Sequence, residues 1–360
     1  MMIAEVADRV HVAGLLAKQS AACGILGSAL YAHILAAAAD DARAGGPVWL
    51  VFRDADLDAI GEAQALRLMA AVHRMVLTGE APGLEPYYPS VGGMLDLQAA
   101  WLEFRRLCGQ QPERVRELLL RPCQTNEVGR SAALLGGFLE LSARWGLPLR
   151  LLEIGSSAGL QLRFDRFFYA TGSHAWGDPR SPVRLQDMWI EPPEHLQAKV
   201  EVAARRGCDP RPVDPLTPEG RTTLTASVWA DQVDRIQRLQ GAVRLAEQVP
   251  AQVDKASAGD WLPDLLAQPA EGTCTVVFHS VVLQYIAPDE RDAVVDCIME
   301  ASAAAHARAP IAWLRLEPED LEKLDRGVPF GVWLGSWPGP GDRRVAWSAA
   351  HGDRVRWTGR

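Results

Sequence analysis

The first 147 residues carry the apolar pattern of α-helices. Apolar residues recur at three- and four-residue spacing, which places them along one helical face. The clearest stretches cover residues 21–44, 63–78, 97–109, 112–120 and 132–145. Clusters of glycine and proline, such as Gly45-Gly46-Pro47, separate these stretches. The pattern predicts a helical cap domain over residues 1–147, followed by a second domain over residues 148–360.

From residue 148 the pattern changes to short apolar runs that alternate with helical segments. We expect strands at residues 149–153, 199–203, 275–278 and 311–316, a further strand with its loop within residues 252–262, and tryptophan-rich strands at 331–337, 343–348 and 354–357. Helices are expected over residues 162–169 and 227–246. Strands that alternate with helices predict an α/β domain with a parallel sheet, and the closely spaced final strands predict an antiparallel edge.

A glycine-punctuated turn follows the first of these strands. Glu153 ends the strand, and Gly155, Ser157 and Gly159 form the turn. Glycines there allow a tight turn and a close approach of backbone N–H groups to a ligand. The E-x-G-x-x-x-G form resembles the first motif of class I S-adenosylmethionine (SAM) methyltransferases more than the dinucleotide G-x-G-x-x-G, because Ser157 stands where that pattern needs glycine. The fold expected is therefore a Rossmann-like class I methyltransferase sheet with an added N-terminal α-helical domain.

The same residues also spell G-x-S-x-G, the nucleophile elbow of α/β-hydrolases. In that alternative Ser157 is the nucleophile, His351 is the base, and Asp254 or Asp260 completes the triad in the required chain order. A hydrolase elbow usually follows several strands and an oxyanion-loop motif. The segment before residue 148 is helical in pattern, which disfavours the hydrolase.

Acids after the second and third strands are the candidates for holding adenosine. The methyltransferase resemblance implies an acid after the second strand, where a carboxylate can accept both ribose hydroxyl hydrogens; Asp209 fits this role best, with Asp214 as the reserve. The same resemblance implies an acid near the adenine amino group after the third strand, and Asp260 is the candidate, with Trp261 beside it as a stacking face. Methyl transfer to oxygen or nitrogen also requires removal of a proton, and His279, at the end of the fourth strand, is the candidate base.

Two further segments concentrate polar side chains where a pocket is expected. Asn126, Glu127 and Arg130 precede the helix that leads into the glycine turn, either as helix caps or as pocket residues. Gln284 and Tyr285 lie one turn beyond His279 and are the other candidate pocket residues.

Composition narrows the class of protein. The 360 residues carry a net charge of −8, which argues against a nucleic-acid surface and favours a small-molecule substrate. No apolar run reaches the length of a membrane span, and the first twelve residues do not form a secretory signal, so we expect a cytoplasmic protein. The six cysteines form no C-x-x-C pair and the eight histidines no ligand spacing, which predicts no metal. The oligomeric state is left open.

Several longer motifs resemble a bacterial family catalogued as domain of unknown function 2332. They are QTNEVGRSAALLGGF, LLEIGSSAGLQLRFDRF, WGDPRSPVRL, RRGCDPRPVDP and VVFHSVVLQYI. The resemblance spans nearly the whole chain and implies a methyltransferase-like Rossmann fold with an added helical region. The function expected is SAM-dependent methyl transfer to a small molecule. A non-catalytic SAM- or nucleotide-binding protein of the same fold is the first alternative, and the serine hydrolase is the second.

Overall fold

The computed structural model describes residues 2–53, 55, 63–121, 123–320 and 329–358. The chain forms two compact units. Residues 1–125 and 217–236 make the helical unit, and residues 126–216 and 237–360 make the sheet unit. The sequence pattern predicts a boundary at residue 147, whereas these units divide at residue 125 because α8 (Ser131–Trp145) packs on strands of the sheet unit. The segment 217–236 belongs with the helical unit, although it follows the first strands of the sheet unit.

The helical unit is built from amphipathic helices, as the spacing of its apolar residues predicts. They are α1 (Met2–Ile25), α2 (Ala29–Arg43), α3 (Pro47–Phe52), α5 (Gln64–Leu77), α6 (Leu97–Gln110), α7 (Pro112–Leu119) and α9 (Pro218–Ala226), with 3-10 turns η1 (Glu85–Tyr87) and η2 (Pro89–Val91). The apolar stretch 21–44 is divided between α1 and α2. Gly27 has a φ of +83°, and the Ser28 hydroxyl caps α2 by accepting the Tyr31 N–H at 3.1 Å.

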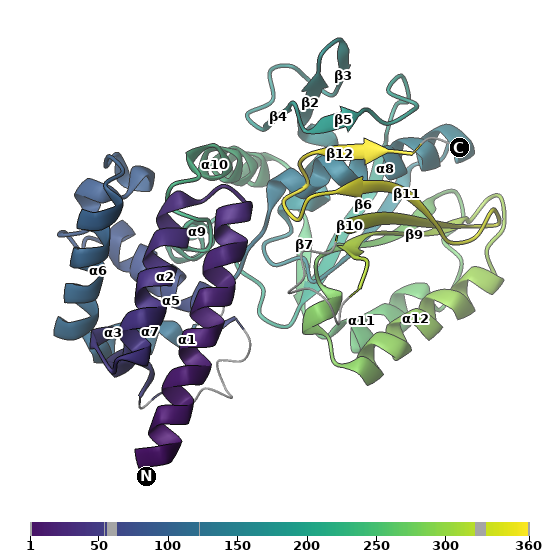
Figure 1. Cartoon of the computed structure of the whole chain (residues 1–360). Coiled ribbons are helices and arrows are strands. Elements are labelled where there is room, and N and C mark those ends of the chain that lie inside the picture. The colour runs from purple at the N-terminus through teal and green to yellow at the C-terminus, as the bar shows by residue number, and fades with distance from the viewer. Residues whose placement is uncertain (1, 54, 56–62, 122, 321–328, 359–360) are drawn as a thin grey trace. The chain divides into compact units, whose positions relative to one another are not determined.

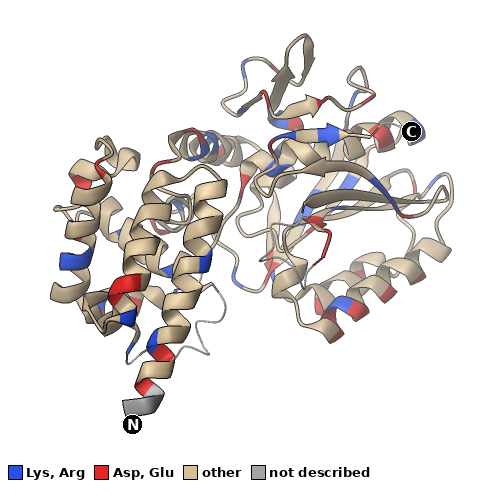
Figure 2. Ribbon diagram, in the orientation of Figure 1, with Lys and Arg blue, Asp and Glu red and all other residues tan. Residues whose placement is uncertain are grey.

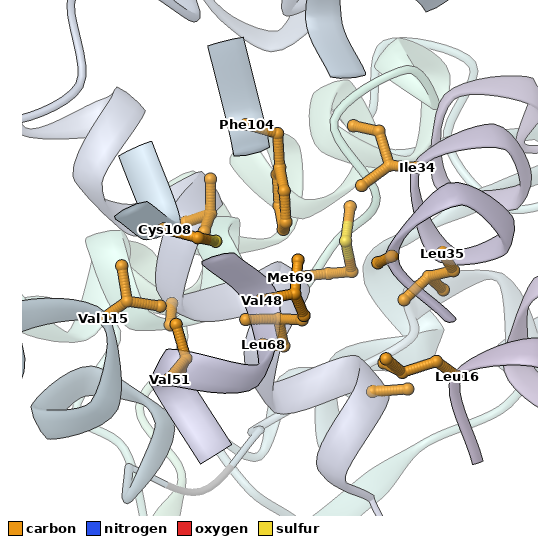
Figure 3. Packing of buried hydrophobic residues seen from close by; sticks show 14 of the residues in the cluster. Leu16, Ile34, Leu35, Val48, Val51, Leu68, Met69, Phe104, Cys108 and Val115 are labelled. Atoms are coloured by element: carbon orange, nitrogen blue, oxygen red, sulfur yellow. The ribbon is translucent and has the colours of Figure 1, made fainter. Parts of the chain in front are cut away.

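Side chains from six helices meet in the core of this unit. Figure 3 shows Leu16 of α1, Ile34 and Leu35 of α2, Val48 and Val51 of α3, Leu68 and Met69 of α5, Phe104 and Cys108 of α6, and Val115 of α7. All ten are fully buried. Burial of this kind is the main favourable term for such a helical unit, since each large apolar side chain contributes about 1.5–3 kcal/mol.

Among the described residues, nine strands of the sheet unit form one sheet in the order β5-β12-β11-β10-β9-β8-β1-β6-β7. Strands β7, β6, β1, β8 and β9 are mutually parallel, and β9 to β12 form an antiparallel meander. The bounds are β1 (Leu149–Ile154), β5 (Trp189–Glu191), β6 (Val202–Asp209), β7 (Gln252–Lys255), β8 (Cys274–Ser280), β9 (Ile311–Pro318), β10 (Phe330–Trp337), β11 (Arg343–Ser348) and β12 (Val355–Trp357). The mixed α/β architecture with a mostly parallel central sheet agrees with the expectation.

Three local expectations are wrong. The second parallel strand begins at Val202 and runs to Asp209, rather than over 199–203. Residues 162–169 do not form one helix, because the 3-10 helix η4 (Leu160–Arg166) ends before β2 (Phe168–Thr171), which pairs with β3 (His174–Trp176) and β4 (Arg184–Gln186) in a small second sheet. Residues 227–246 are not one helix either, since α10 (Val233–Gln248) starts only after a break behind α9.

Helices cover the two faces of the parallel part of the sheet (Figure 1). On one face, Leu152, Val277 and Trp313 pack with residues of α11 (Ala258–Leu266) and α12 (Pro288–Ala303). On the other face, Phe278 meets Phe138 of α8 edge to face, with ring centroids 5.3 Å apart. Because successive strand residues point to opposite faces, each side chain near a strand end can be assigned to one face.

Charged residues of both signs are distributed over the two units, and several acidic residues lie along α12 (Figure 2). Among the residues that the structure describes, no helix is long and apolar enough to span a bilayer.

Candidate functional site

The strand order creates one position in the parallel sheet where connections leave in opposite directions. From β1 the chain moves outward to β6 and β7, and it then returns to β8 on the other side of β1 and continues to β9. In open α/β sheets, ligands bind at the carboxyl ends of the strands at such a switch point. The glycine turn at 155–159 follows β1 at this point, as the sequence predicts.

The backbone of the turn requires its glycines. Gly155 and Gly159 have φ values of +63° and +64°, a region that other residues avoid. A Cβ atom on Gly155 would lie 2.6 Å from Cγ2 of Val282, and one on Gly159 would lie 2.8 Å from Cγ2 of Val253. The turn is therefore closely packed between the residues that follow β8 and those of β7.

Asp209 is joined directly to this turn. It is the last residue of β6, and its Oδ2 accepts the Ser157 N–H at 2.9 Å while Oδ1 accepts the Arg211 N–H at 2.8 Å. The side chain is 8% exposed. Its long separation from Gly155 in sequence is spanned by η4 and the small sheet, after which β6 pairs with β1. Asp209 thus lies where the sequence analysis expects the ribose-binding acid.

The segment before α8 also reaches this edge. Asn126 accepts the Leu160 N–H on its Oδ1 at 3.0 Å, so it holds the end of the glycine turn. Glu127 caps η3 (Val128–Arg130) by accepting the Gly129 N–H at 3.0 Å. Arg130 donates to the Ser280 carbonyl oxygen at 3.1 Å, at the end of β8. The structure therefore brings Asn126 and Arg130 to the carboxyl edge, where they bond to backbone, while Glu127 caps the 3-10 turn between them.

Several buried polar atoms at this edge have no hydrogen-bond partner in the described structure. They are Glu153 Oε2, Ser157 Oγ and Gln161 Oε1. Burial raises the pKa of Glu153 well above its ordinary range, nearby Asp209 adds to the rise, and Arg163 opposes it. The other end of the Gln161 amide donates to Ser280 Oγ at 2.9 Å. Buried polar atoms are normally paired, so these three mark where a ligand or ordered water is expected.

His279 lies on the opposite face of the sheet from these atoms. Glu153 pairs with Phe278 across β1 and β8, so the next residue, His279, points toward α11 and α12. The ring is fully buried, with Nδ1 2.7 Å from Glu317 Oε1 and with Nε2 accepting the Trp313 indole N–H at 3.1 Å. Both ring nitrogens are engaged within the protein. The expected role as a general base has no support in this geometry.

The remaining candidates lie at the periphery of the site. Asp260 is exposed in the first turn of α11, where its Oδ2 accepts the Ser257 hydroxyl at 2.6 Å in a helix-capping arrangement. Gln284 and Tyr285 belong to the 3-10 turn η5 (Leu283–Tyr285), and Tyr285 is 71% exposed. Their roles toward adenine and substrate stay predictions.

The hydrolase alternative gains nothing from the structure. Ser157 has a φ of +53°, as a nucleophile elbow would, but its Oγ is buried and has no hydrogen-bond partner among the described residues, histidine included. A triad requires the serine hydroxyl to be bonded to its base.

Glu317 was not among the residues that the sequence pointed to, although it ends a predicted strand. Its Oε1 accepts the Val282 N–H at 2.9 Å in addition to the bond from His279. Val282 in turn packs against Gly155. The sequence signal that could have identified Glu317 is its position directly after the expected strand 311–316, since residues at strand ends face the ligand crevice in parallel sheets.

A separate hollow of about 260 Å³ lies at the opposite edge of the sheet. Its lining includes Arg150, Thr275 and Ile311, which begin or nearly begin β1, β8 and β9. Arg150 donates twice to the Leu265 carbonyl oxygen at 3.1 Å, which explains this guanidinium as a cap on the end of α11.

Comparison with known proteins supports the resemblance of the longer motifs. No curated protein matches the chain. The model of one family, described as an uncharacterised protein conserved in bacteria (DUF2332), matches residues 13–357. This match covers nearly the whole chain, both units included, and the protein therefore belongs to the DUF2332 family.

Proposed function

We propose that the sheet unit binds SAM at the carboxyl edge of β1, β6 and β8 and transfers its methyl group to a small molecule. The observation that carries this proposal is the bond between Asp209 and the glycine turn at the switch point. A carboxylate at the end of the second parallel strand, held against the first turn, is suited to accept ribose hydroxyls with its remaining lone pairs.

The charges at this edge favour SAM over a dinucleotide. The turn leads into η4, a seven-residue 3-10 helix with a kink at Arg163, rather than into an α-helix whose N-terminus could hold a pyrophosphate. Asp209 already occupies the Ser157 N–H, so a carboxylate lies directly at the turn. Acidic side chains repel a pyrophosphate and attract a sulfonium cation.

The chain's own residues would hold and align the ligand. Asp209 fixes the turn and faces the ribose, while Glu153 Oε2 and Ser157 Oγ are the unpartnered atoms that the methionine end would satisfy. Bound SAM supplies an activated methyl group on sulfur, so the protein's main task is alignment of the acceptor. His279 is left out of the proposed chemistry because both its ring nitrogens are engaged.

Titration calorimetry with SAM and with S-adenosylhomocysteine (SAH) tests this proposal. We expect the wild type to bind both with a Kd on the order of micromolar. Ser157→Ala should weaken SAH binding by about 5- to 10-fold without loss of stability, because the Ser157 hydroxyl makes no hydrogen bond with the residues that the structure describes.

The matched control is Ser156→Ala, which removes the bond from Ser156 Oγ to the Cys208 carbonyl oxygen at 3.2 Å. This variant should lose about 1 kcal/mol of unfolding free energy and keep its affinity for SAH. Absence of SAM and SAH binding in the wild type would overturn the proposal. Binding without methyl transfer to any acceptor would favour the non-catalytic alternative.

A further inference from the structure

The protonation of His279 follows from its neighbours. The Trp313 indole N–H can only donate, so the His279 Nε2 that it contacts must be an acceptor without a proton. The ring proton therefore resides on Nδ1 and is donated to Glu317 Oε1. Glu317 Oε1 is therefore the acceptor of the His279 Nδ1–H.

The two carboxyl oxygens of Glu317 differ in their hydrogen-bond partners. Oε1 receives two donors, from His279 and from the Val282 backbone. Oε2 is buried and has no partner in the described structure, and Glu317 as a whole is only 3% exposed. A buried carboxylate oxygen without a donor is costly, and a native fold keeps one where a ligand or an ordered water satisfies it.

The position of Glu317 connects this oxygen to the proposed site. Glu317 lies near the carboxyl end of β9, and the Val282 that it holds packs against Gly155 of the glycine turn. Val281, immediately before, has a φ of +58°, which is strained for a β-branched residue. Trp313, His279 and Glu317 thus fix the strained turn after β8, which packs against the glycine turn, and Glu317 adds a buried carboxyl group at that turn.

We propose that Glu317 Oε2 binds an ammonium group of a ligand at this edge of the sheet. A carboxylate oxygen, which can only accept, selects N–H donors, prefers cationic ones and repels carboxylates and phosphates. The ammonium group belongs either to the methionine end of SAM or to an amine that shares the site. The inference rests on the proposed function for the first source and is independent of it for the second.

Glu317→Gln tests the charge without dismantling the network, because a glutamine Oε1 still accepts from His279 and Val282. Glu319→Gln is the matched control, two residues further on, where Glu319 is exposed and pairs with Arg344. The melting temperatures of both variants should stay within about 2 °C of the wild type. Calorimetry then uses SAH, 5′-methylthioadenosine, which lacks the amino-acid part, and n-butylamine.

Glu317→Gln should weaken the binding of one of these probes by at least about 10-fold, while Glu319→Gln should leave the binding of all three unchanged. If Glu317→Gln binds SAH more weakly but binds 5′-methylthioadenosine as the wild type does, the ammonium group belongs to SAM. If only the affinity for n-butylamine decreases, the ammonium group belongs to a second molecule. This result would hold even if SAH does not bind and the proposed function is wrong. If SAH binds the wild type and Glu317→Gln equally, and n-butylamine does not distinguish them, the inference is overturned while the proposed function survives.

Discussion

Replacing Gly155 by valine is expected to abolish SAH binding and to destabilise the sheet unit strongly. Valine at a φ of +63° is strained, and its Cβ would lie 2.6 Å from Cγ2 of Val282. Backbone strain of this kind costs about 1–3 kcal/mol and overpacking costs a similar amount, so we expect a loss of about 3–5 kcal/mol of unfolding free energy. Urea unfolding and SAH calorimetry on the same preparation measure both effects.

Gly146→Val separates the two causes. Gly146 ends α8 with a φ of +61°, and a Cβ there would meet no atom within 4 Å. This variant has the backbone strain without the clash, so it should lose about 1–2 kcal/mol and keep full SAH affinity. Equal losses of unfolding free energy in Gly155→Val and Gly146→Val would show that the packing of Gly155 against Val282 is unimportant.

The stability of the protein is expected to fall by on the order of 3 kcal/mol between pH 6.5 and pH 4 because of His73 alone. His73 of α5 is fully buried, and its Nε2 lies 2.9 Å from Ser90 Oγ. Burial lowers the pKa of His73 from its ordinary value of 6.5 to about 4. In this window the unfolded chain binds a proton that the folded protein excludes, so stability is intact above pH 6.5 and is lost as the pH falls toward 4.

His73→Phe is the variant that isolates this effect. At pH 7 it loses the bond to Ser90 and should be less stable by about 1 kcal/mol. As the pH falls to 4 the wild type should lose stability faster, so that the order of the two proteins reverses. Chemical unfolding at half-unit steps of pH measures the difference, in which the carboxyl groups common to both proteins cancel. Parallel pH profiles would contradict the buried neutral state of His73.

The sequence predicted those features that are encoded locally. The glycine turn, the buried strand β8 and the antiparallel tail follow from patterns within a few residues of one another, and the structure confirms them. The proximity of Asp209 to the turn was also anticipated, because the ends of parallel strands meet at one edge of a sheet.

The sequence could not supply features that depend on register and on distant pairing. His279 was expected in the site because it follows a buried strand, but only the pairing of Glu153 with Phe278 shows that it points to the other face. Glu317 becomes notable only once its bonds to His279 and Val282 are seen. The return of residues 217–236 to the helical unit likewise has no local signature.

Hydrogen exchange of the wild type with and without SAH tests the location of the site most directly. The account predicts slower amide exchange on SAH binding in residues 153–160, 207–211 and 279–284, which lie at the carboxyl ends of β1, β6 and β8. Protection confined to the amino edge, around Arg150 and Ile311, or to the helical unit would contradict it.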